Sequence, residues 1–341
     1  MWAHFRAYFK VIAMKSQHEE HILLSDHQSY HKIRSLVSGY ILNCRCEAKS
    51  PATIENYTYR LNCFIWFCQA QNYPDDTQNI KPNHIRQFLY YLSTQSNRWG
   101  NNTTSARKPA SHSTINHYYR VLHTFFNWMC QEELIEHNPL THIKAPKLEY
   151  KVIQALTPNE LKLLFHQCSA KTYLDVRNRA ILMMFLDTGL RVSELVNLNL
   201  DDIDTKTGTI LVRYGKGSKE RIVRIGNKAQ KALWRYLTIY RQGYHSNLFL
   251  SRNGDPLTST GVKLMVRRLA KQASIINVHV HRLRHTFAIS FLRAGGDVFS
   301  LQYLLGHTTF QMTHRYLQSL NANDAINAHR RFSPLDRILV I

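Results

Sequence analysis

Residues 209–225 read TILVRYGKGSKERIVRI, and here the spacing of apolar residues changes from helical to alternating. The segments 209–214 and 219–225 are rich in β-branched residues and flank Gly215-Lys216-Gly217-Ser218. Alternation is typical of half-buried strands, and a short glycine-rich connection between two of them is typical of a hairpin. The sequence therefore predicts one small antiparallel sheet within a chain whose other periodic segments are helical.

The first part of the chain carries helical patterns. Apolar residues recur at helical spacing over four segments, 31–46, 51–67, 84–94 and 114–131. Ser50-Pro51 places a capping residue before a proline at the first helical position. Residues 96–111 are rich in Asn, Ser and Thr, so we expect a loop there. We predict an all-α domain over 28–138, preceded by a leader of uncertain order over 1–27.

The second part begins after a linker predicted over 139–150, which holds two prolines and scattered lysines. Thr157-Pro158-Asn159-Glu160 has the form of a capping box. An apolar helix is expected over 178–186, and the chain beyond the hairpin, 228–328, is mostly helical in pattern. The fold class we predict is mainly α with a small antiparallel β-sheet, an all-α domain followed by an α+β domain over 151–341.

Charge is the strongest compositional signal. The 341 residues include 44 Lys plus Arg against 23 Asp plus Glu, a formal net charge of +21. Residues 1–150 hold 16 basic and 11 acidic side chains, a net of +5, whereas residues 151–341 hold 28 and 12, a net of +16. Such an excess favours a polyanionic partner, which this signal alone leaves open between DNA, RNA and an anionic membrane.

Composition also excludes some classes of protein. The longest apolar run, 180–186, is far shorter than the roughly 20 residues that span a bilayer, so we expect a soluble globular protein. Six cysteines in a chain of this length are no disulfide framework, and they lack paired zinc-site spacing. We expect them to be reduced and the protein to be cytoplasmic. Met14 offers an alternative start.

Four small clusters in the second part combine cations with glycines or helix ends. They are Arg191 with Glu194, Lys216 in the hairpin, the run 279–285, and Gly306-His307 followed by Tyr316. Each has an ordinary structural interpretation. A helix-terminal arginine pairs with a nearby acid, a turn lysine stays hydrated, and a tyrosine such as Tyr316 or Tyr303 packs at the edge of a core.

A metal site is a further alternative for the histidine run. His281 and His285 are spaced i, i+4 on one helix face as zinc ligands often are, with His279 and His307 as possible further ligands. No glutamate follows His281, and arginines lie among the ligands, where their charge would oppose a divalent cation. We therefore predict no metal and no other cofactor.

Together the clusters suit one reaction. A phosphodiester undergoing transfer concentrates negative charge on its nonbridging oxygens, and this charge is stabilised by metal ions or by guanidinium and imidazole groups. The clusters supply two arginines, two histidines and a lysine. Between 279 and 316 the only acid is Asp297, so no carboxylate cluster is present there to hold Mg²⁺.

Motif order points to a family. The chain reads TGLRVSEL at 188–195, GKGSKER at 215–221, HRLRHTFA at 281–288 and LLGH at 304–307, and then reaches Tyr316. This series resembles the tyrosine recombinases, the phage-integrase and Xer family, through about residues 150–320. The helical first part is similar, more loosely, to the core-binding (DNA-binding) domain of that family.

The resemblance implies a set of residues that hold the phosphate. Arg191 and Arg284 would clamp the scissile phosphate, because the planar guanidinium presents donors in the geometry of phosphate oxygens. His307 would donate to a nonbridging oxygen. Glu194 would hold the site together without contacting the substrate.

The resemblance also implies the groups that react. Tyr316 would be the nucleophile, Lys216 the general acid for the departing 5′ oxygen, and His281 a base or hydrogen-bond partner. A free phenol with a pKa of about 10 is about one part in a thousand ionised at pH 7, so adjacent cations would assist it. A 3′-phosphotyrosine retains the ester bond for rejoining, and no high-energy cofactor is needed.

The function implied is site-specific recombination of double-stranded DNA, in integration, excision or resolution, by a homotetramer on paired sites. A mobile element or phage is one setting for it. One alternative is a type IB topoisomerase-like enzyme that relaxes strands without exchanging them. The other is a catalytically silent DNA-binding protein of the same fold.

Overall fold

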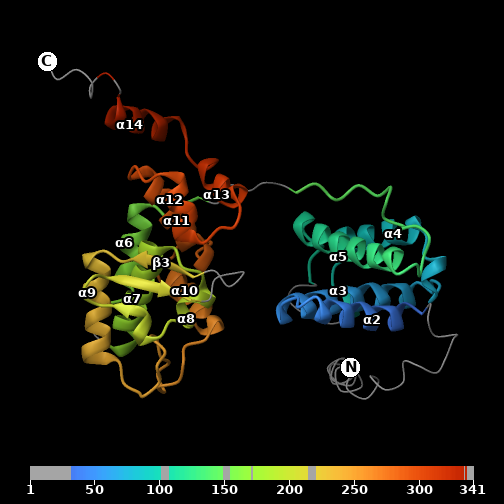
Figure 1. Ribbon diagram of the computed structural model, residues 1–341, viewed down its shortest axis with the longest axis horizontal. Helices are drawn as coiled ribbons and strands as arrows, with labels where there is room; N and C mark the ends of the chain where they lie inside the picture. The colour runs from blue at the N-terminus through green and yellow to red at the C-terminus, as the bar shows by residue number, and fades with distance from the viewer. Residues whose placement is uncertain are drawn as a thin grey trace. The chain divides into compact units, whose positions relative to one another are not determined.

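The computed structural model describes residues 32–100, 107–148, 154–169, 172–213, 220–333 and 335. The chain divides into two compact units, residues 1–150 and 151–341, which are treated separately below (Figure 1). Within the described residues, no helix has both the length and the apolar composition needed to cross a membrane.

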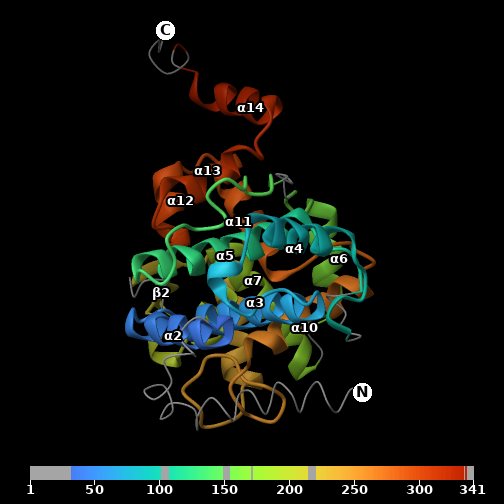
Figure 2. The same cartoon turned by 90° about the vertical axis from the view of Figure 1, so that its right-hand side faces the viewer.

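The first unit is built from helices, as predicted. Its α-helices are α2 (Ile33–Cys46), α3 (Pro51–Ala70), α4 (Pro82–Thr94) and α5 (His112–Gln131), with 3₁₀ turns η3 (Thr77–Asn79) and η4 (Arg98–Gly100). Helices α2 and α3 form one layer and α4 and α5 a second (Figures 1 and 2). The predicted cap is present, since Ser50 Oγ accepts a hydrogen bond from Thr53 N at 3.2 Å. Each predicted helical pattern lies within one of these α-helices or overlaps most of it.

An aromatic core joins the two layers, with Phe64, Phe88, Phe125 and Phe126 fully buried. The expected loop over 96–111 is only partly a loop. Trp99 in η4 is buried and stacks edge-on against Trp66 at 5.3 Å between ring centroids. A single large aromatic side chain thus draws part of a polar segment into the core.

The beginning of the predicted linker also packs on this unit. Leu140 and Ile143 are buried in its core. Asn116 Nδ2 donates to the Pro146 carbonyl and Tyr119 Oη to the Ile143 carbonyl, both at 2.8 Å. Residues 140–146 are therefore held against α5 by apolar packing and by two side-chain hydrogen bonds.

The second unit combines helices with a small sheet. Its helices are α6 (Pro158–His166), α7 (Tyr173–Thr188), α8 (Val192–Val196), η5 (Leu200–Asp202), α9 (Asn227–Arg235), the π-helix η6 (Tyr236–Tyr240), α10 (Ser259–Gln272), α11 (Val280–Arg293), α12 (Val298–Leu305), α13 (Phe310–Leu317) and α14 (Ala322–Phe332). The predicted capping box opens α6, with Glu160 N donating to Thr157 Oγ1 at 3.2 Å and Thr157 N to Glu160 Oε2 at 2.7 Å.

The sheet has three antiparallel strands in the order β1 (Ile203–Asp204), β2 (Thr209–Val212) and β3 (Arg221–Arg224). Strands β2 and β3 pair from Thr209 opposite Arg224 to Val212 opposite Arg221, which confirms the predicted antiparallel pairing. The tip of the predicted hairpin, residues 214–219, lies outside the described residues. Strand β1, two residues long, was not predicted. The fold class is confirmed.

Helix α7 is the centre of the second core and packs against α9, α11 and β3. It begins at Tyr173, five residues before the predicted start at 178, because Thr172 caps it and Asp175 completes a capping box. At the far end of the unit, α14 has no buried residue, and the ion pair from Arg293 Nε to Asp324 Oδ1 (2.9 Å) ties it to α11. Both views show α14 apart from the body of this unit (Figures 1 and 2).

Candidate active site

Two glycines end the helices that frame the site. Gly189 ends α7 with φ +64°, and a Cβ there would lie 2.4 Å from Phe287. Gly306 ends α12 with φ +62°, and a Cβ there would lie 2.9 Å from Arg221 Nη1. L side chains rarely adopt this backbone conformation, and at both positions a neighbour fills the space. Glycine is therefore required where two of the predicted motifs turn.

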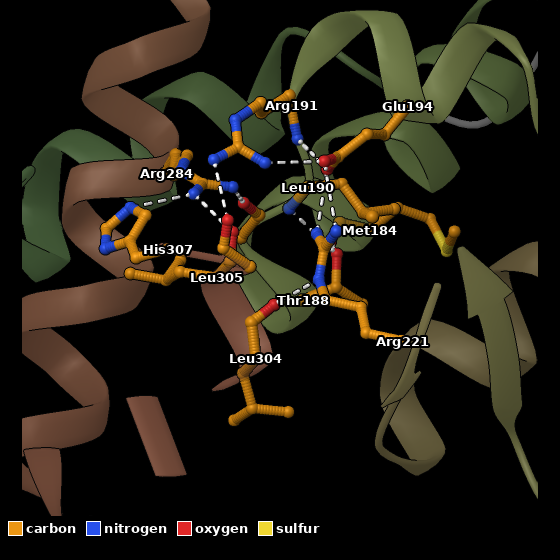
Figure 3. Close-up of polar contacts among 12 residues, drawn as sticks. Met184, Thr188, Leu190, Arg191, Glu194, Arg221, Arg284, Leu304, Leu305 and His307 are labelled. Atoms are coloured by element: carbon orange, nitrogen blue, oxygen red, sulfur yellow. Dashed lines mark hydrogen bonds and ion pairs between the residues drawn. The ribbon is translucent and has the colours of Figure 1, made fainter. Parts of the chain in front are cut away.

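The C-terminal end of α12 gathers three arginines from three other elements (Figure 3). Leu304 O accepts from Arg221 Nε at 2.7 Å, Leu305 O from Arg284 Nη2 at 2.7 Å, and Gly306 O from Arg191 Nη2 at 3.1 Å. The last carbonyls of a helix lack partners within the helix and carry partial negative charge, so they stabilise cations. Three successive carbonyls thus bring together residues from the N-cap of α8, from β3 and from α11.

Glu194 lies under this cluster and is 3% exposed. Its Oε1 accepts from Arg191 Nη1 at 2.7 Å and from Arg221 Nη1 at 3.0 Å. Its Oε2 accepts from Arg191 N and from Arg221 Nη2, both at 2.8 Å. Burial alone would raise the pKa of Glu194, but hydrogen bonds from the two arginines outweigh it and lower the pKa to about 2. The carboxylate is therefore ionised and links the two guanidinium groups.

Arg284 and His307 form the next contact. Arg284 is 5% exposed, donates to the Gly189 carbonyl, and places Nη2 3.1 Å from His307 Nε2. Burial, together with the neighbouring charge of Arg191, lowers the pKa of Arg284 to about 10, at which it remains charged at pH 7. Burial and the charges of Arg284, Arg191 and Arg221 lower the pKa of His307 to about 4. His307 is thus neutral at pH 7.

The neutral imidazole of His307 can have only one arrangement of its proton here. A guanidinium only donates, so His307 Nε2 must accept from Arg284. Its Nδ1 then carries the hydrogen and donates to Thr313 Oγ1 at 2.8 Å. Thr313 is fully buried on α13, so this bond fixes the plane of the ring relative to the helix that carries Tyr316.

Tyr316 lies beside two imidazoles. Its ring is parallel to that of His307, with 5.9 Å between centroids and 2° between planes, and is 5.1 Å from that of His285. The phenol also interacts with the Arg284 guanidinium, where it opposes the lowering of that group's pKa. The structure therefore brings Tyr316 beside Arg284 and His307.

His281 and Lys216 are the two remaining residues of the predicted site. His281 lies on the first turn of α11, 6.4 Å from the His279 ring, with part of its surface exposed. Partial desolvation of its imidazole, together with His279 and the nearby charge of Arg284, lowers its pKa. Lys216 lies outside the described residues. His285 faces Tyr316 instead of pairing with His281 around a metal. In the part of the chain that the structure describes, no three His, Cys, Asp or Glu side chains gather as metal ligands would.

Arg221 is the last residue of the motif at 215–221, and the family resemblance implies no role for it. It is 5% exposed and bonds both Glu194 and the end of α12. The signal for it was the alternation along β3, in which Arg221 and Val223 are buried whereas Ile222 and Arg224 are exposed. A charged residue at an inward position of a short strand indicates a buried ion pair.

Tyr303 differs from the expectation of a packed side chain. It lies on α12, before the break at Gly306, but is 58% exposed, and its hydroxyl accepts a long hydrogen bond from Ile222 N at 3.5 Å. The adjacent Leu305 is buried instead. Tyr303 and Tyr316 thus occupy different environments, and Tyr316 is the one beside the arginines.

The cluster can bind a phosphodiester and place a phenol beside it. Three guanidinium groups and one carboxylate give the cluster an excess of positive charge. Among the described residues 279–316 the only other acid is Asp297, which is fully exposed. Arg191 has a side chain that is 20% exposed, so it can reach a ligand while Glu194 holds its other edge. Guanidinium donors suit phosphate oxygens.

Comparison with known proteins agrees with this geometry. Residues 154–323 match the model of the phage integrase family, and residues 36–136 match the phage integrase N-terminal SAM-like domain. The chain is similar to the tyrosine recombinase XerC of Bacillus pumilus, at 34% identity over 276 residues, covering 78% of this chain and 86% of that protein. It is also 34% identical to the XerC of Staphylococcus carnosus, covering 81% and 97%.

Solved structures show the same fold. A Tn1549 transposon integrase in complex with a circular intermediate DNA has a TM-score of 0.70 and 21% identity, covering 89% of this chain and all of that one. A lambda integrase dimer bound to a core site has a TM-score of 0.66 and 18% identity, covering 85% and 96%. On the strength of the family models and of the XerC relatives, the chain belongs to the phage integrase family of tyrosine recombinases.

Proposed function

We propose that this protein is a site-specific recombinase that cleaves and rejoins duplex DNA through a 3′-phosphotyrosine intermediate formed by Tyr316. The observation that carries this proposal is the position of the Tyr316 ring, stacked on His307, whose Nε2 is 3.1 Å from Arg284 in the arginine cluster at the end of α12. A nucleophile beside an arginine-lined anion site is the arrangement that phosphoryl transfer requires.

In the proposed reaction Arg191 and Arg284 hold the nonbridging oxygens of the scissile phosphate. The Tyr316 oxygen attacks phosphorus, and the bond from phosphorus to the 5′ oxygen breaks. The phenolic proton passes to His281, and Lys216 gives a proton to the departing 5′ oxygen. Rejoining reverses each transfer, so bonds and protons balance without a cofactor.

His307 requires one adjustment for its proposed role. In the structure its Nε2 accepts from Arg284, so it has no proton to give to a phosphate. A bound phosphate would draw the Arg284 donor to itself and favour the protonated imidazole. His307 then donates from Nε2 while Thr313 continues to accept from Nδ1.

The proposed partner is double-stranded DNA, which the second unit would engage with its net charge of +16. Relatives of the same fold are described in complex with DNA. We propose that residues 28–138 form a DNA-binding unit and residues 151–341 the catalytic one. All six cysteines are free thiols, and this supports a reducing, cytoplasmic setting.

Strand exchange joins four DNA ends, so we propose assembly of a homotetramer on paired sites. Helix α14 is the segment expected to dock on a neighbouring copy, because none of its residues is buried and Ile326 and Phe332 are 55% and 47% exposed. Deletion of residues 323–341 is expected to leave duplex binding and abolish recombination in a two-site plasmid assay.

The test of the proposed function uses a duplex selected from a random library by its affinity for the protein. A nick beside the cleavage position releases a short fragment, so that the covalent adduct accumulates. Tyr316→Phe should fold, bind this duplex and form no adduct. Tyr303→Phe, the matched control, should still form one.

The outcomes separate the alternatives. An adduct that persists in Tyr316→Phe overturns the assignment of the nucleophile, and the absence of any adduct from the wild type would identify a silent DNA-binding protein. A wild type that forms adducts and relaxes supercoiled plasmid, yet never exchanges strands between two sites, would instead be topoisomerase-like.

A further inference from the structure

A buried arginine outside the proposed reacting groups connects three parts of the site. Arg221 leaves β3 pointing inward, with a side chain that is 4% exposed. Its Nη1 and Nη2 bind the two oxygens of Glu194 at 3.0 Å and 2.8 Å, and its Nε binds the Leu304 carbonyl at 2.7 Å. The guanidinium thus spans β3, α8 and the end of α12 and is too buried to contact a DNA strand itself.

The shape of the site around Arg221 supports a specific role. A Cβ on Gly306 would lie 2.9, 3.2 and 3.3 Å from Nη1, Cζ and Cδ of Arg221. The arginine side chain therefore lies flat against the glycine whose carbonyl accepts from Arg191 Nη2 at 3.1 Å. Glycine at this position serves the arginine contact as well as the left-handed turn.

Arg221 determines the net charge of the group that it forms with Glu194 and Arg191. Glu194 would neutralise Arg191 if the two formed an isolated pair, since their oxygen and nitrogen are 2.7 Å apart. Arg221 is a second cation on the same carboxylate, so the group of three keeps a net positive charge facing the phosphate site. It also occupies the other lone pairs of Glu194, and so limits the Arg191 side chain to one bond with the acid.

We propose that Arg221 is a positioning residue for DNA cleavage, which acts through Glu194 to hold Arg191 oriented toward the scissile phosphate and keeps the net charge of these three residues positive. This inference rests on the proposed function and assigns a role within the same site. Arg221 touches neither DNA nor the reacting atoms in this proposal.

The proposed role of Arg221 predicts a change in the pH dependence of DNA cleavage. The charged and titratable groups that face Glu194 are Arg191 from α8, Arg221 from β3, Arg284 from α11 and His307 after α12. With both arginine partners present the pKa of Glu194 is about 2, below any practical assay. Removal of Arg221 leaves the effect of burial on Glu194 less opposed, so the pKa of this carboxylate should rise above its ordinary value of about 4.3. Cleavage should then fail at mildly acidic pH.

The experiment measures single-turnover adduct formation on the selected nicked duplex between pH 5 and 9, with the full chain. Arg221→Met should bind the duplex like the wild type but react about 10- to 100-fold more slowly at pH 7.5, by analogy with the loss when a residue that orients a metal ligand is removed. Its rate should fall further as the pH approaches 5, in a range where the wild type does not lose activity through Glu194. Arg224→Met, on the exposed side of the same strand, is the matched control and should react normally.

A second comparison separates positioning from stability. Glu194→Gln has no carboxylate to titrate, so adding Arg221→Met to it should neither slow the reaction much further nor introduce the acidic loss. Arg221→Lys keeps the positive charge but can make only one contact with Glu194 in place of the paired one. It should therefore recover part of the rate and show a smaller loss of rate at acidic pH. If Arg221→Met does not fold, the lysine variant carries the same test.

Several results would overturn the inference. One is a pH profile for Arg221→Met that matches the wild type after scaling, and another is a loss of rate in the double variant equal to the product of the two single losses. A variant that reacts like Arg224→Met would also contradict it while leaving the proposed function intact. A wild type without an adduct would overturn both.

Discussion

His307 links the stability of the second unit to pH, and the size of the effect follows from the site. In the folded protein its pKa is about 4 instead of 6.5, because burial and three nearby arginines disfavour the charged ring. At about 1.36 kcal/mol per pKa unit, the difference is worth about 3 kcal/mol. This is a large part of the stability of an ordinary domain, about 5–15 kcal/mol.

The sign is determined by which state binds the proton. As pH falls below 6.5 the unfolded chain protonates this histidine, whereas the folded chain does not until about pH 4. The free energy of unfolding should therefore decrease by about 3 kcal/mol across this window through His307 alone. His307→Gln has no proton to bind, so its stability should not show this part of the decrease.

Urea unfolding followed by circular dichroism, at several pH values from 4 to 7.5, measures this difference. The free energy of the transition should be compared between wild type, His307→Gln and His314→Gln, the last an exposed histidine on α13. Wild type and His314→Gln should lose stability in parallel, and His307→Gln should lose about 3 kcal/mol less. Curves for His307→Gln and wild type that stay parallel would refute the argument that the arginines keep this ring neutral.

Four further outcomes are expected. Gly189→Ala should destabilise the second unit by about 1–3 kcal/mol or more in urea unfolding, since it adds a side chain at φ +64° against Phe287; an unchanged midpoint would contradict the close contact. Lys216→Ala should bind duplex normally and cleave about 10²- to 10⁴-fold more slowly, with rescue by a 5′-bridging phosphorothiolate that needs no proton, and failure of rescue would remove the general-acid role. Duplex affinity should fall by about 0.9 log units per phosphate contact for each tenfold rise in salt, and a flat titration would exclude an electrostatic interface. Adduct formation should survive excess EDTA, and a loss that Mg²⁺ or Zn²⁺ restores would return the histidine run to a metal site.

Local signals predicted the elements well. The caps at Ser50 and Thr157 marked helix starts that the structure confirms, because a side-chain hydrogen bond to the first turn depends only on residues three apart. The hairpin strands were predicted for the same reason, since alternation is a local property. The start of α7 was placed five residues late because the prediction followed apolar residues, whereas Thr172 and Asp175 set the boundary.

Non-local packing was harder to predict. Trp99 lies in a polar segment whose composition indicates a loop, yet it is buried against rings from α3, α4 and α5. The side chain of Arg221 likewise finds its partners 27 and 83 residues away. No local pattern contains such a pairing, and only the inward phase of a four-residue strand pointed to it.

Residue types indicate which side chains form the site but do not indicate what holds them in place. Arg191, Arg284, the histidines and Tyr316 could be singled out because phosphate chemistry favours those side chains. What fixes their spacing is a set of backbone carbonyls at 304, 305 and 306, and every residue has a carbonyl. Their availability depends on where α12 ends, and Gly306 determines that end by its left-handed turn. The glycine beside the predicted histidine is therefore as much a part of the phosphate site as the arginines, because it decides which carbonyls are left to hold them.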